Sequence, residues 1–369
     1  MKVTFPHMGN AYIAVKSLLD TIGVDYFMPP IGSKKTMEYG VINSPEFMCL
    51  PFKIVIGDFI QGLNNGADVI IFGGGCGQCR LSYYGDLQQE ILRNQGYEFE
   101  YIHLNLSNMS YHDIIKKLRP IIKDKSIFSI IQGITRGIWT VFAVDKLYKL
   151  ASKTRCREIL KGSTDKIMNE FENTVQKVTG FQNIKNAIKF SSKALSNLEI
   201  DRDMIPLKIS IIGEIFIVSD PFTNLQIERK LGNMGAEVYN SISVSSWIKE
   251  HFIHNLMPIK PKDKPVEAAQ EYMKIDEFGG HGIYTIGNAI LNSKAKFDGI
   301  IQVYPFTCMP EIIAQCTFSE IQRKYKTPIM TLILDEMTGE VGYMTRLEAF
   351  VDMLKMRKDN MENNNQIET

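Results

Sequence analysis

Four of the six cysteines in this chain have neighbours that are typical of metal ligands. Cys76 and Cys79 form a C-x-x-C pair in GGGCGQCR (73–80), and Cys49 and Cys308 each open a C-x-P, in CLPF and CMPE. Each of the four precedes a segment that predicts the start of a helix. The first turn of a helix offers unpaired N–H groups and the positive end of the dipole, which favour a thiolate over a thiol. The four cysteines therefore have the chemistry of ligands to a metal or an iron–sulfur centre.

The other two cysteines lack such a setting. Cys156 lies between Arg155 and Arg157 in a charged segment. Cys316 lies in a predicted amphipathic helix, where a cysteine usually acts as a small apolar residue. Six cysteines in a chain without a secretory signal indicate metal or redox chemistry rather than a disulfide framework.

Composition predicts an ordinary soluble protein. The 369 residues favour two or three domains, 44% are hydrophobic, and 42 basic residues against 41 acidic ones give a net charge of +1. This balance implies no nucleic-acid partner. The N-terminus MKVTFPHMGN has no apolar signal region, and no long uninterrupted apolar run is present. We therefore expect a cytoplasmic protein without a membrane partner.

Apolar strands alternate with helices in two parts of the chain, which predicts an α/β fold with parallel sheets covered on both faces. Residues 140–205 contain no convincing strand and are predicted to form a helical connector of two or three helices. The prediction is two Rossmann-like domains, at 1–139 and 206–358, joined by that connector and followed by a polar tail at 359–369. The predicted strands are 2–6, 24–29, 67–75, 99–105, 206–214, 236–240, 296–305 and 328–335. The predicted helices are 11–23, 51–66, 81–96, 110–122, 221–235, 310–325 and 345–358.

The two α/β parts resemble degenerate copies of one another. Each begins strand, turn, helix, strand, and each later has a strand that ends at a cysteine, in DVIIFGGGCGQC and DGIIQVYPFTCMP. Ligands of open parallel sheets bind beyond the carboxyl ends of the strands. If the copies face each other, Cys76, Cys79 and Cys308 meet in one cleft, and Cys49 completes the set.

Four cysteines with these neighbours allow several interpretations. A structural zinc usually has two close C-x-x-C pairs in one short module, whereas this chain has one pair and two distant partners. Iron–sulfur clusters accept remote ligands, and bare glycine backbone can approach their sulfides. A thioredoxin-like dithiol would explain C-G-Q-C but would leave Cys49 and Cys308 unused. Buried apolar cysteines are the remaining alternative.

Long stretches of the chain also resemble a known family. The runs SPEFMCLPFKIVIGDFIQGLNNGADVIIFGGGCGQCRLSYYGDLQQEILR (44–93), YPFTCMPEIIAQ (304–315) and TPIMTLILDEMTGEVGYMTRLEAFVDML (327–354) resemble the acyl-CoA dehydratase activase-related proteins. These are similar to the cluster-bearing subunits of 2-hydroxyacyl-CoA dehydratases and of benzoyl-CoA reductase-type enzymes. The resemblance extends from Met1 to Leu354 and is loosest in the helical middle.

The resemblance implies a [4Fe–4S] cluster, with a double-cubane cluster as the second choice, bound by Cys49, Cys76, Cys79 and Cys308. It also implies low-potential electron transfer in an anaerobe, an acyl-CoA substrate and a separate ATP-dependent activase as electron donor. Whether the chain forms a homo- or hetero-oligomer is left open by the sequence. No phosphate-binding loop for ATP is present in the chain itself. Four cysteine ligands would saturate the cluster and favour electron relay or cluster assembly. Three would leave an iron open for lyase or reductase chemistry, and a zinc-stabilised module is the alternative of another class.

Several polar residues are candidates for supporting roles, each with a plain structural alternative. His7 and His281 could transfer protons or ligate, but a lone histidine is more often a hydrogen-bonded loop residue. Carboxylates that follow strands could face the site or simply cap helices and shape turns. Arg80 could place a positive charge near an anionic cluster or could be a solvated surface residue. The carboxylates concerned are Glu214, Asp220, Asp335 and Glu336.

Overall fold

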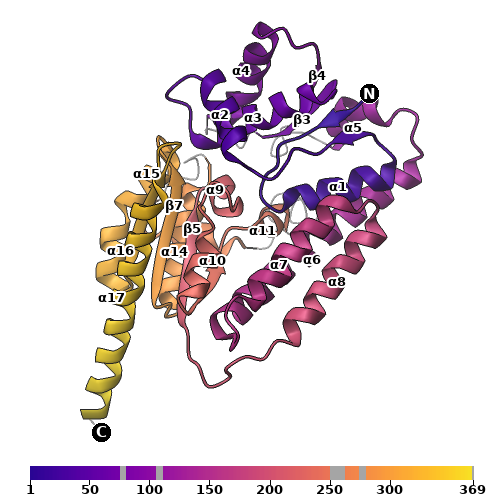
Figure 1. Cartoon of the computed structure of the whole chain (residues 1–369). Coiled ribbons are helices and arrows are strands. Elements are labelled where there is room, and N and C mark those ends of the chain that lie inside the picture. The colour runs from indigo at the N-terminus through magenta and orange to yellow at the C-terminus, as the bar shows by residue number, and fades with distance from the viewer. Residues whose placement is uncertain (75–79, 105–110, 250–261, 274–279, 368–369) are drawn as a thin grey trace.

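The computed structural model of the chain describes residues 1–74, 80–104, 111–249, 262–273 and 280–367 (Figure 1). Within these residues, eight strands form two four-stranded parallel sheets with the orders β2-β1-β3-β4 and β6-β5-β7-β8. The strands are β1 (Val3–Thr4), β2 (Tyr26–Phe27), β3 (Val69–Gly73), β4 (Glu100–Leu104), β5 (Leu207–Gly213), β6 (Ala236–Asn240), β7 (Gly299–Pro305) and β8 (Ile329–Leu334).

Helices follow most strands and cover the sheets, as the βα alternation predicts. They are α1 (Ala11–Ile22), α2 (Lys34–Asn43), α3 (Leu50–Asn64), α4 (Leu81–Asn94), α5 (Tyr111–Ile122), α6 (Ile127–Arg157), α7 (Ser163–Lys177), α8 (Phe181–Ser196), α9 (Ile215–Ser219), α10 (Ile227–Asn233), α11 (Val244–Ile248), α13 (Lys264–Ala269), α14 (Gly282–Lys294), α15 (Met309–Cys316), α16 (Phe318–Tyr325) and α17 (Glu340–Ile367). The α/β class expected from the sequence is confirmed.

The strands of the second sheet are apolar on both sides because helices cover both faces of the sheet. Every residue of β7 is buried, and alternate residues of the sheet contact different helices. Ile211 and Val303 pack with α17 on one face, whereas Ile212 and Ile300 pack with α14 and α15 on the other. A parallel strand covered on both faces has no solvent side and therefore no polar alternation.

The two sheets have the same topology, which supports the interpretation of the chain as two degenerate copies. In each sheet the first strand is central, the second lies on one side of it and the third on the other. This 2-1-3-4 order is that of flavodoxin-like doubly wound sheets, not the 3-2-1-4 order of the classic Rossmann fold. The switch points lie between β1 and β3 and between β5 and β7. The segments with Cys76 and Cys79 and with Cys308 follow β3 and β7, so they start at these switch points.

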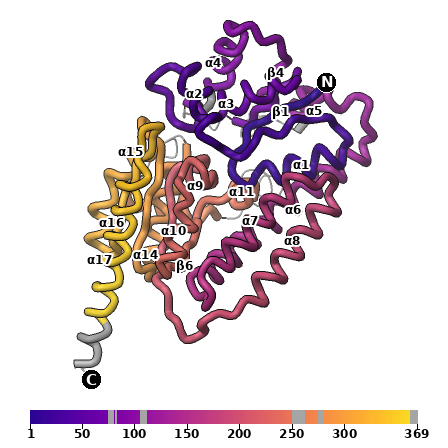
Figure 2. Tube along the Cα trace, in the orientation of Figure 1, coloured from indigo at the N-terminus to yellow at the C-terminus, as the bar shows by residue number. Residues whose placement is uncertain are grey.

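Four helices, α5 to α8, lie between the two sheets in the chain, and of these α6 and α8 pack beside α1 (Figure 2). Helix α6 begins at Ile127 and packs along α1, so the expected boundary at residues 139 and 140 falls inside a continuous helix. Its length of 31 residues and its apolar composition are also those of a membrane-crossing helix. Single polar residues divide this helix, so it contains no uninterrupted apolar run.

Other differences from the sequence prediction are local. Helix α2 lies in a segment expected to be a loop, and the helix expected at 221–235 is reduced to α10 after a turn. Thr317 divides the helix expected at 310–325 into α15 and α16. Helix α17 begins earlier than expected and continues to Ile367, through most of the stretch expected to be a polar tail.

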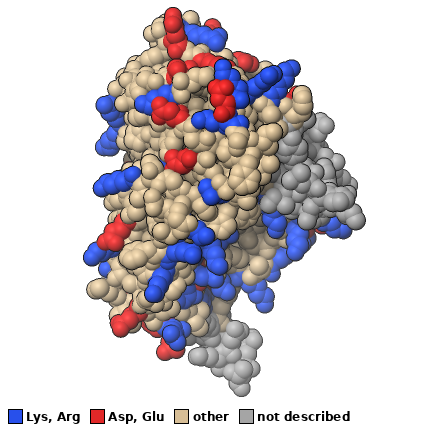
Figure 3. All heavy atoms as spheres, turned by 90° about the vertical axis from the view of Figure 1, so that its right-hand side faces the viewer, with Lys and Arg blue, Asp and Glu red and all other residues tan. Residues whose placement is uncertain are grey.

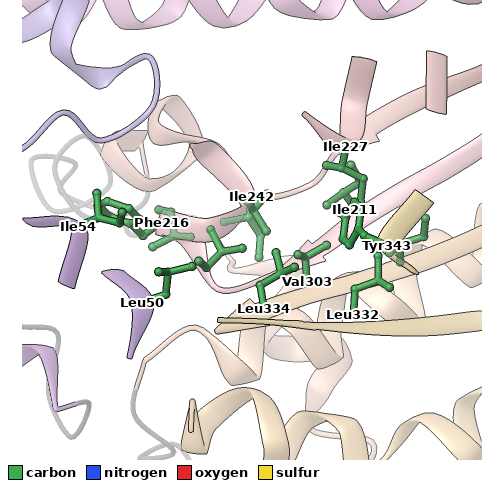
Figure 4. Packing of buried hydrophobic residues seen from close by; sticks show 14 of the residues in the cluster. Leu50, Ile54, Ile211, Phe216, Ile227, Ile242, Val303, Leu332, Leu334 and Tyr343 are labelled. Atoms are coloured by element: carbon green, nitrogen blue, oxygen red, sulfur yellow. The ribbon is translucent and has the colours of Figure 1, made fainter. Parts of the chain in front are cut away.

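The two halves share one hydrophobic cluster. Leu50 and Ile54, in the first turns of α3, approach Phe216 of α9 and the end of β8 at Leu334 (Figure 4). These side chains are nearly fully buried. The residue that precedes Leu50 is Cys49, so one candidate ligand is attached directly to the interface between the halves.

Candidate metal centre

Cys49 and Cys308 occupy equivalent local settings, as the C-x-P motifs predict. Cys49 is the N-cap of α3 and Cys308 is the N-cap of α15, each with extended backbone and with proline in the first turn of its helix. Proline fits there because the first N–H groups of a helix have no intrahelical acceptor. Both cysteines are partly buried, and neither forms a disulfide.

Arg80 connects the segments that contain these two cysteines. Its Nη2 donates to the carbonyl oxygen of Thr307 at 3.0 Å and to the Thr307 hydroxyl at 2.8 Å. Its Nη1 donates more weakly to the carbonyl oxygen of Phe47 at 3.5 Å. Thr307 directly precedes Cys308, and Phe47 lies two residues before Cys49. Arg80 directly follows the C-x-x-C pair in the sequence, so its guanidinium group links the residue after that pair to the segments before Cys49 and Cys308.

The contacts of Arg80 bear on one of its two readings, that of a solvated surface residue. Its side chain is exposed, but it is not a simple solvated arginine, since it bridges the two halves of the molecule. Thr307 holds a left-handed backbone conformation with φ of 71°, which is uncommon for a residue with a branched side chain. The bridge therefore fixes the turn from β7 into the helix that begins at Cys308.

The thiol of Cys49 lies in a nearly closed environment. Its Sγ is 2.8 Å from the hydroxyl oxygen of Tyr84. The pKa of the Cys49 thiol is raised to about 11, mainly by burial and in small part by the Glu214 carboxylate, against the opposing effects of the Tyr84 hydroxyl and Arg80. The protein alone thus keeps this thiol protonated. A bound metal would replace the proton and supply the positive charge that the site lacks.

Two acids with low exposure, Glu214 and Glu311, lie near the cysteines. Glu214 caps α9, and its carboxylate accepts hydrogen bonds from the backbone N–H groups of Phe216 and Ile217, each at 3.0 Å. The helix-cap reading of Glu214 is therefore confirmed. Glu311, three residues after Cys308, is 1% exposed. Burial raises the pKa of Glu311 to about 7, and the Glu214 charge adds to the shift.

Glu311 belongs to a polar network inside the second half. Its carboxylate accepts hydrogen bonds from the Thr285 hydroxyl at 2.9 Å and from the Gln302 amide at 2.9 Å. The Gln302 amide oxygen in turn accepts from the Thr331 hydroxyl at 3.0 Å. The network anchors the start of α15, and so the position of Cys308, to β7 and β8.

His7 and Asp220 lie where the first half meets the second. His7 is buried and stacked on Tyr12 with ring centroids 4.2 Å apart, and its ring nitrogens have no hydrogen-bond partner among the described residues. Burial lowers the pKa of His7 to about 4, so the ring is neutral at physiological pH. Asp220 accepts hydrogen bonds from the backbone N–H groups of Thr223 at 2.8 Å and Gly9 at 3.3 Å. Asp220 thus shapes a turn and joins the two halves.

The remaining predicted polar residues have structural settings. His281 is the N-cap of α14, with its ring centroid 5.9 Å from that of Tyr284. Asp335 shapes a turn by accepting from the Thr338 hydroxyl at 2.8 Å. Glu336 forms an ion pair with Lys53 of α3, whose side chain is only 3% exposed. Sequence reasoning missed this pair because its members are far apart in the chain.

Cys156 and Cys316 lie apart from Arg80 and its contacts. Cys156 is fully buried in α6, where its thiol donates to the carbonyl oxygen of Lys153 at 3.3 Å. Cys316 ends α15 and is exposed, so the expectation that it packs as a small apolar residue is wrong. Its thiol donates to the carbonyl oxygen of Ile312 at 3.4 Å.

A cavity of about 150 Å³ lies elsewhere, between the connector helices and the second half. Asp165 of α7 lies in its wall and accepts hydrogen bonds from Arg155 of α6 at 2.8 Å and from Arg229 of α10 at 2.7 Å. The cavity lining includes none of the cysteines. Its ion pairs hold the connector against the second half.

The described residues contain only part of the predicted ligand set. Cys76 and Cys79 lie outside them, and among the described residues no group of three or more His, Cys, Asp and Glu side chains is placed to hold a metal ion. Cys49 and Cys308 are the described members of the set, and Arg80 adjoins the other two. Tyr84 and Glu311 are additional site residues that the motifs alone did not single out. No protein-family model and no curated protein matches this chain.

Proposed function

We propose that the chain binds an iron–sulfur cluster through Cys49, Cys76, Cys79 and Cys308 and acts in a low-potential electron-transfer system of the 2-hydroxyacyl-CoA dehydratase or acyl-CoA reductase type. The observation that carries the proposal is the Arg80 bridge. It joins the residue after the C-x-x-C pair to the segments before Cys49 and Cys308.

The donor chemistry also fits. Thiolates are the usual ligands of [4Fe–4S] clusters, and ligands drawn from two domains suit a cofactor at their interface. Cys49 and Cys308 are N-caps, where the nearby backbone N–H groups can donate hydrogen bonds to cluster sulfur and tune its potential. A bound cluster of this kind supplies electrons one at a time.

The surrounding side chains have definable roles in such a site. The Arg80 guanidinium would offset part of the negative charge of four thiolates. The Tyr84 hydroxyl, 2.8 Å from the Cys49 sulfur, would donate a hydrogen bond to the thiolate and lower its charge density. Glu311, with its pKa near 7, could hold or release a proton behind Cys308 without being exposed to water.

The energy source would be a separate protein. The chain has no phosphate-binding loop, and a family resemblance implies an ATP-dependent activase as electron donor, acting with an acyl-CoA substrate. A non-catalytic electron relay or a cluster-assembly protein is the second candidate, because four cysteine ligands would leave no iron open to a substrate.

Metal analysis tests the cluster. Protein purified without oxygen is expected to contain iron and acid-labile sulfide in matching amounts, with a paramagnetic signal on reduction. Cys49→Ala, Cys76→Ala, Cys79→Ala and Cys308→Ala should each lower the iron content. Cys156→Ala is the matched control, since Cys156 is buried in α6 and contacts Lys153 instead. Equal iron in all five variants, or zinc without sulfide, would refute the cluster.

A second measurement separates enzyme from relay. Reduced protein is mixed with 2-hydroxyacyl-CoA thioesters, and its spectrum and turnover with an activase are recorded. A changed cluster signal with product formation supports catalysis. An unchanged signal with every thioester, in protein that still exchanges electrons with a donor, supports the relay.

A further inference from the structure

Helix α6 exposes a row of large apolar side chains. We name as the α6 stripe the residues Ile127, Phe128, Ile131, Ile134, Ile138 and Phe142, which recur at helical spacing along the first half of this helix. Ile127 and Phe128 are 76% and 74% exposed. Between Ile127 and Val144 the only charged residue is Arg136. Soluble proteins rarely expose so long an apolar row without a partner.

The α6 stripe is not the outer edge of a core. The opposite face of α6, with Gly133, Gly137, Thr140 and Val144, is buried against α1. The 18-residue stretch of α6 whose apolar composition is that of a membrane-crossing helix is only 28% buried. A core helix with this composition would be mostly buried. One face of α6 is therefore committed to the protein, and the other faces outward.

The part of the chain that contains the α6 stripe is strongly basic. Residues 111–200, which contain α5 to α8, have 17 Lys and Arg against 8 Asp and Glu, a net charge of +9. The rest of the chain has 25 against 33, a net charge of −8. The near-zero total therefore hides a strongly basic segment. Figure 3, which views the side of the molecule with α6 and α8, shows plainly more blue than red over it.

Several of these basic residues lie next to the start of α6 or on the neighbouring helix α8. The Lys185 ammonium of α8 lies 5.7 Å from the ring centre of Trp139 on α6. Lys123 is exposed and lies four residues before Ile127 at the turn into α6. Lys189 and Lys193 are exposed on α8, one and two turns beyond Lys185.

We propose that the α6 stripe and its basic surround bind the surface of an anionic lipid bilayer. Apolar side chains next to lysines are the pattern of interfacial helices, whose apolar face enters the headgroup region while cations meet lipid phosphates. Spanning is excluded for α6 as it is packed here, because its other face is held by α1. A second copy is disfavoured as occupant, since two copies of the same basic segment would repel each other. The inference is independent of the proposed function and reverses the expectation of no membrane partner.

Vesicle sedimentation tests the proposal on the full chain. The protein is expected to sediment with vesicles of phosphatidylcholine mixed with phosphatidylglycerol at low salt, and not with phosphatidylcholine alone. Phe128→Asp and Ile131→Asp should each weaken the binding at least about tenfold, because a charge cannot enter the apolar layer. Lys189→Ala and Lys193→Ala should each weaken it about fivefold, the effect of removing one cation from the surface.

The controls separate loss of binding from loss of fold. Phe128, Ile131 and both lysines are exposed, so their variants should keep the circular dichroism spectrum and melting temperature of the parent. Ile205→Asp is the matched control, since Ile205 is 78% exposed but lies outside the basic region. Binding that is absent, or equal in all variants, would overturn the proposal. A concentration-dependent dimer that is lost in Phe128→Asp and Ile131→Asp would overturn it in favour of a second copy.

Discussion

The ion pair between Lys53 and Glu336 makes a sharp prediction about the interface between the halves. Lys53 belongs to α3 of the first half and its side chain is 3% exposed, whereas Glu336 follows β8 of the second half and is 23% exposed. Glu336→Gln removes the partner but leaves the ammonium group buried. Breaking a buried pair in this way costs about 3 to 5 kcal/mol. Because water reaches Glu336, we expect the low end of the range, about 3 kcal/mol.

The reverse substitution should cost less. Lys53→Met replaces the buried charge by an apolar chain of similar length and leaves only a carboxylate that water can reach, so we expect a loss of about 1 kcal/mol. The stability of the double variant should be close to that of Lys53→Met, because without Lys53 the Glu336→Gln substitution leaves no buried charge unpaired. The effects of the two substitutions are therefore strongly non-additive.

Urea unfolding of the four proteins, followed by circular dichroism, measures these differences. A cost for Glu336→Gln that is smaller than that for Lys53→Met, or costs that simply add in the double variant, would refute the reasoning. Either result would show that the Lys53 ammonium finds water or another acceptor without Glu336.

Three further predictions follow from buried groups and a close contact. Glu311 has a native pKa near 7 against an ordinary value of about 4.3, so stability should fall by about 3 kcal/mol as pH rises through this window, and Glu311→Gln should flatten that fall in urea unfolding. The pKa of His7 is about 4 in the folded protein against about 6.5 in the unfolded chain. The folded protein should therefore keep its full stability above pH 6.5 and lose about 3 kcal/mol as pH falls through 4. His7→Phe should not show this loss. Gly9→Ala should lower the melting temperature far more than Gly66→Ala, because a Cβ at Gly9 would lie 2.0 Å from the Ser219 carbonyl oxygen while nothing lies within 4 Å at Gly66. Both glycines have positive φ, so the control removes the backbone effect that they share.

The strands were predictable because burial on both faces leaves a strong local pattern. All eight predicted strands exist, and β6 begins and ends where the sequence indicates. Helix α2 was missed because its stability is not local. A Cβ at Gly40 of α2 would lie 1.8 Å from the Lys53 carbonyl oxygen of α3, so the two helices touch backbone to backbone. Such a contact is invisible to hydrophobic periodicity.

Of the candidate site, only the local motifs could be predicted from the sequence. A proline after each cysteine fixed Cys49 and Cys308 at helix starts, which is a local effect. The Arg80 bridge was not predictable, since its partners lie 33 and 227 residues away. Its geometry comes from the packing of the halves. The basic segment at 111–200 is not visible in the net charge, because the acidic excess in the rest of the chain cancels it.

The shared topology also explains how the candidate ligands are distributed between the two halves. In the first half, Cys49 begins the helix before the third strand, and Cys76 and Cys79 follow that strand. In the second half, His281 takes the place of Cys49 at the start of α14, and Cys308 alone follows the third strand.

Three thiols therefore belong to one half and one thiol to the other. If the proposed cluster forms, its fourth ligand depends on how closely the halves pack. Arg80 and the Lys53–Glu336 pair join these halves beside Cys308 and Cys49. The choice between a saturated cluster and one with an open iron thus depends on interface contacts as much as on the cysteines themselves.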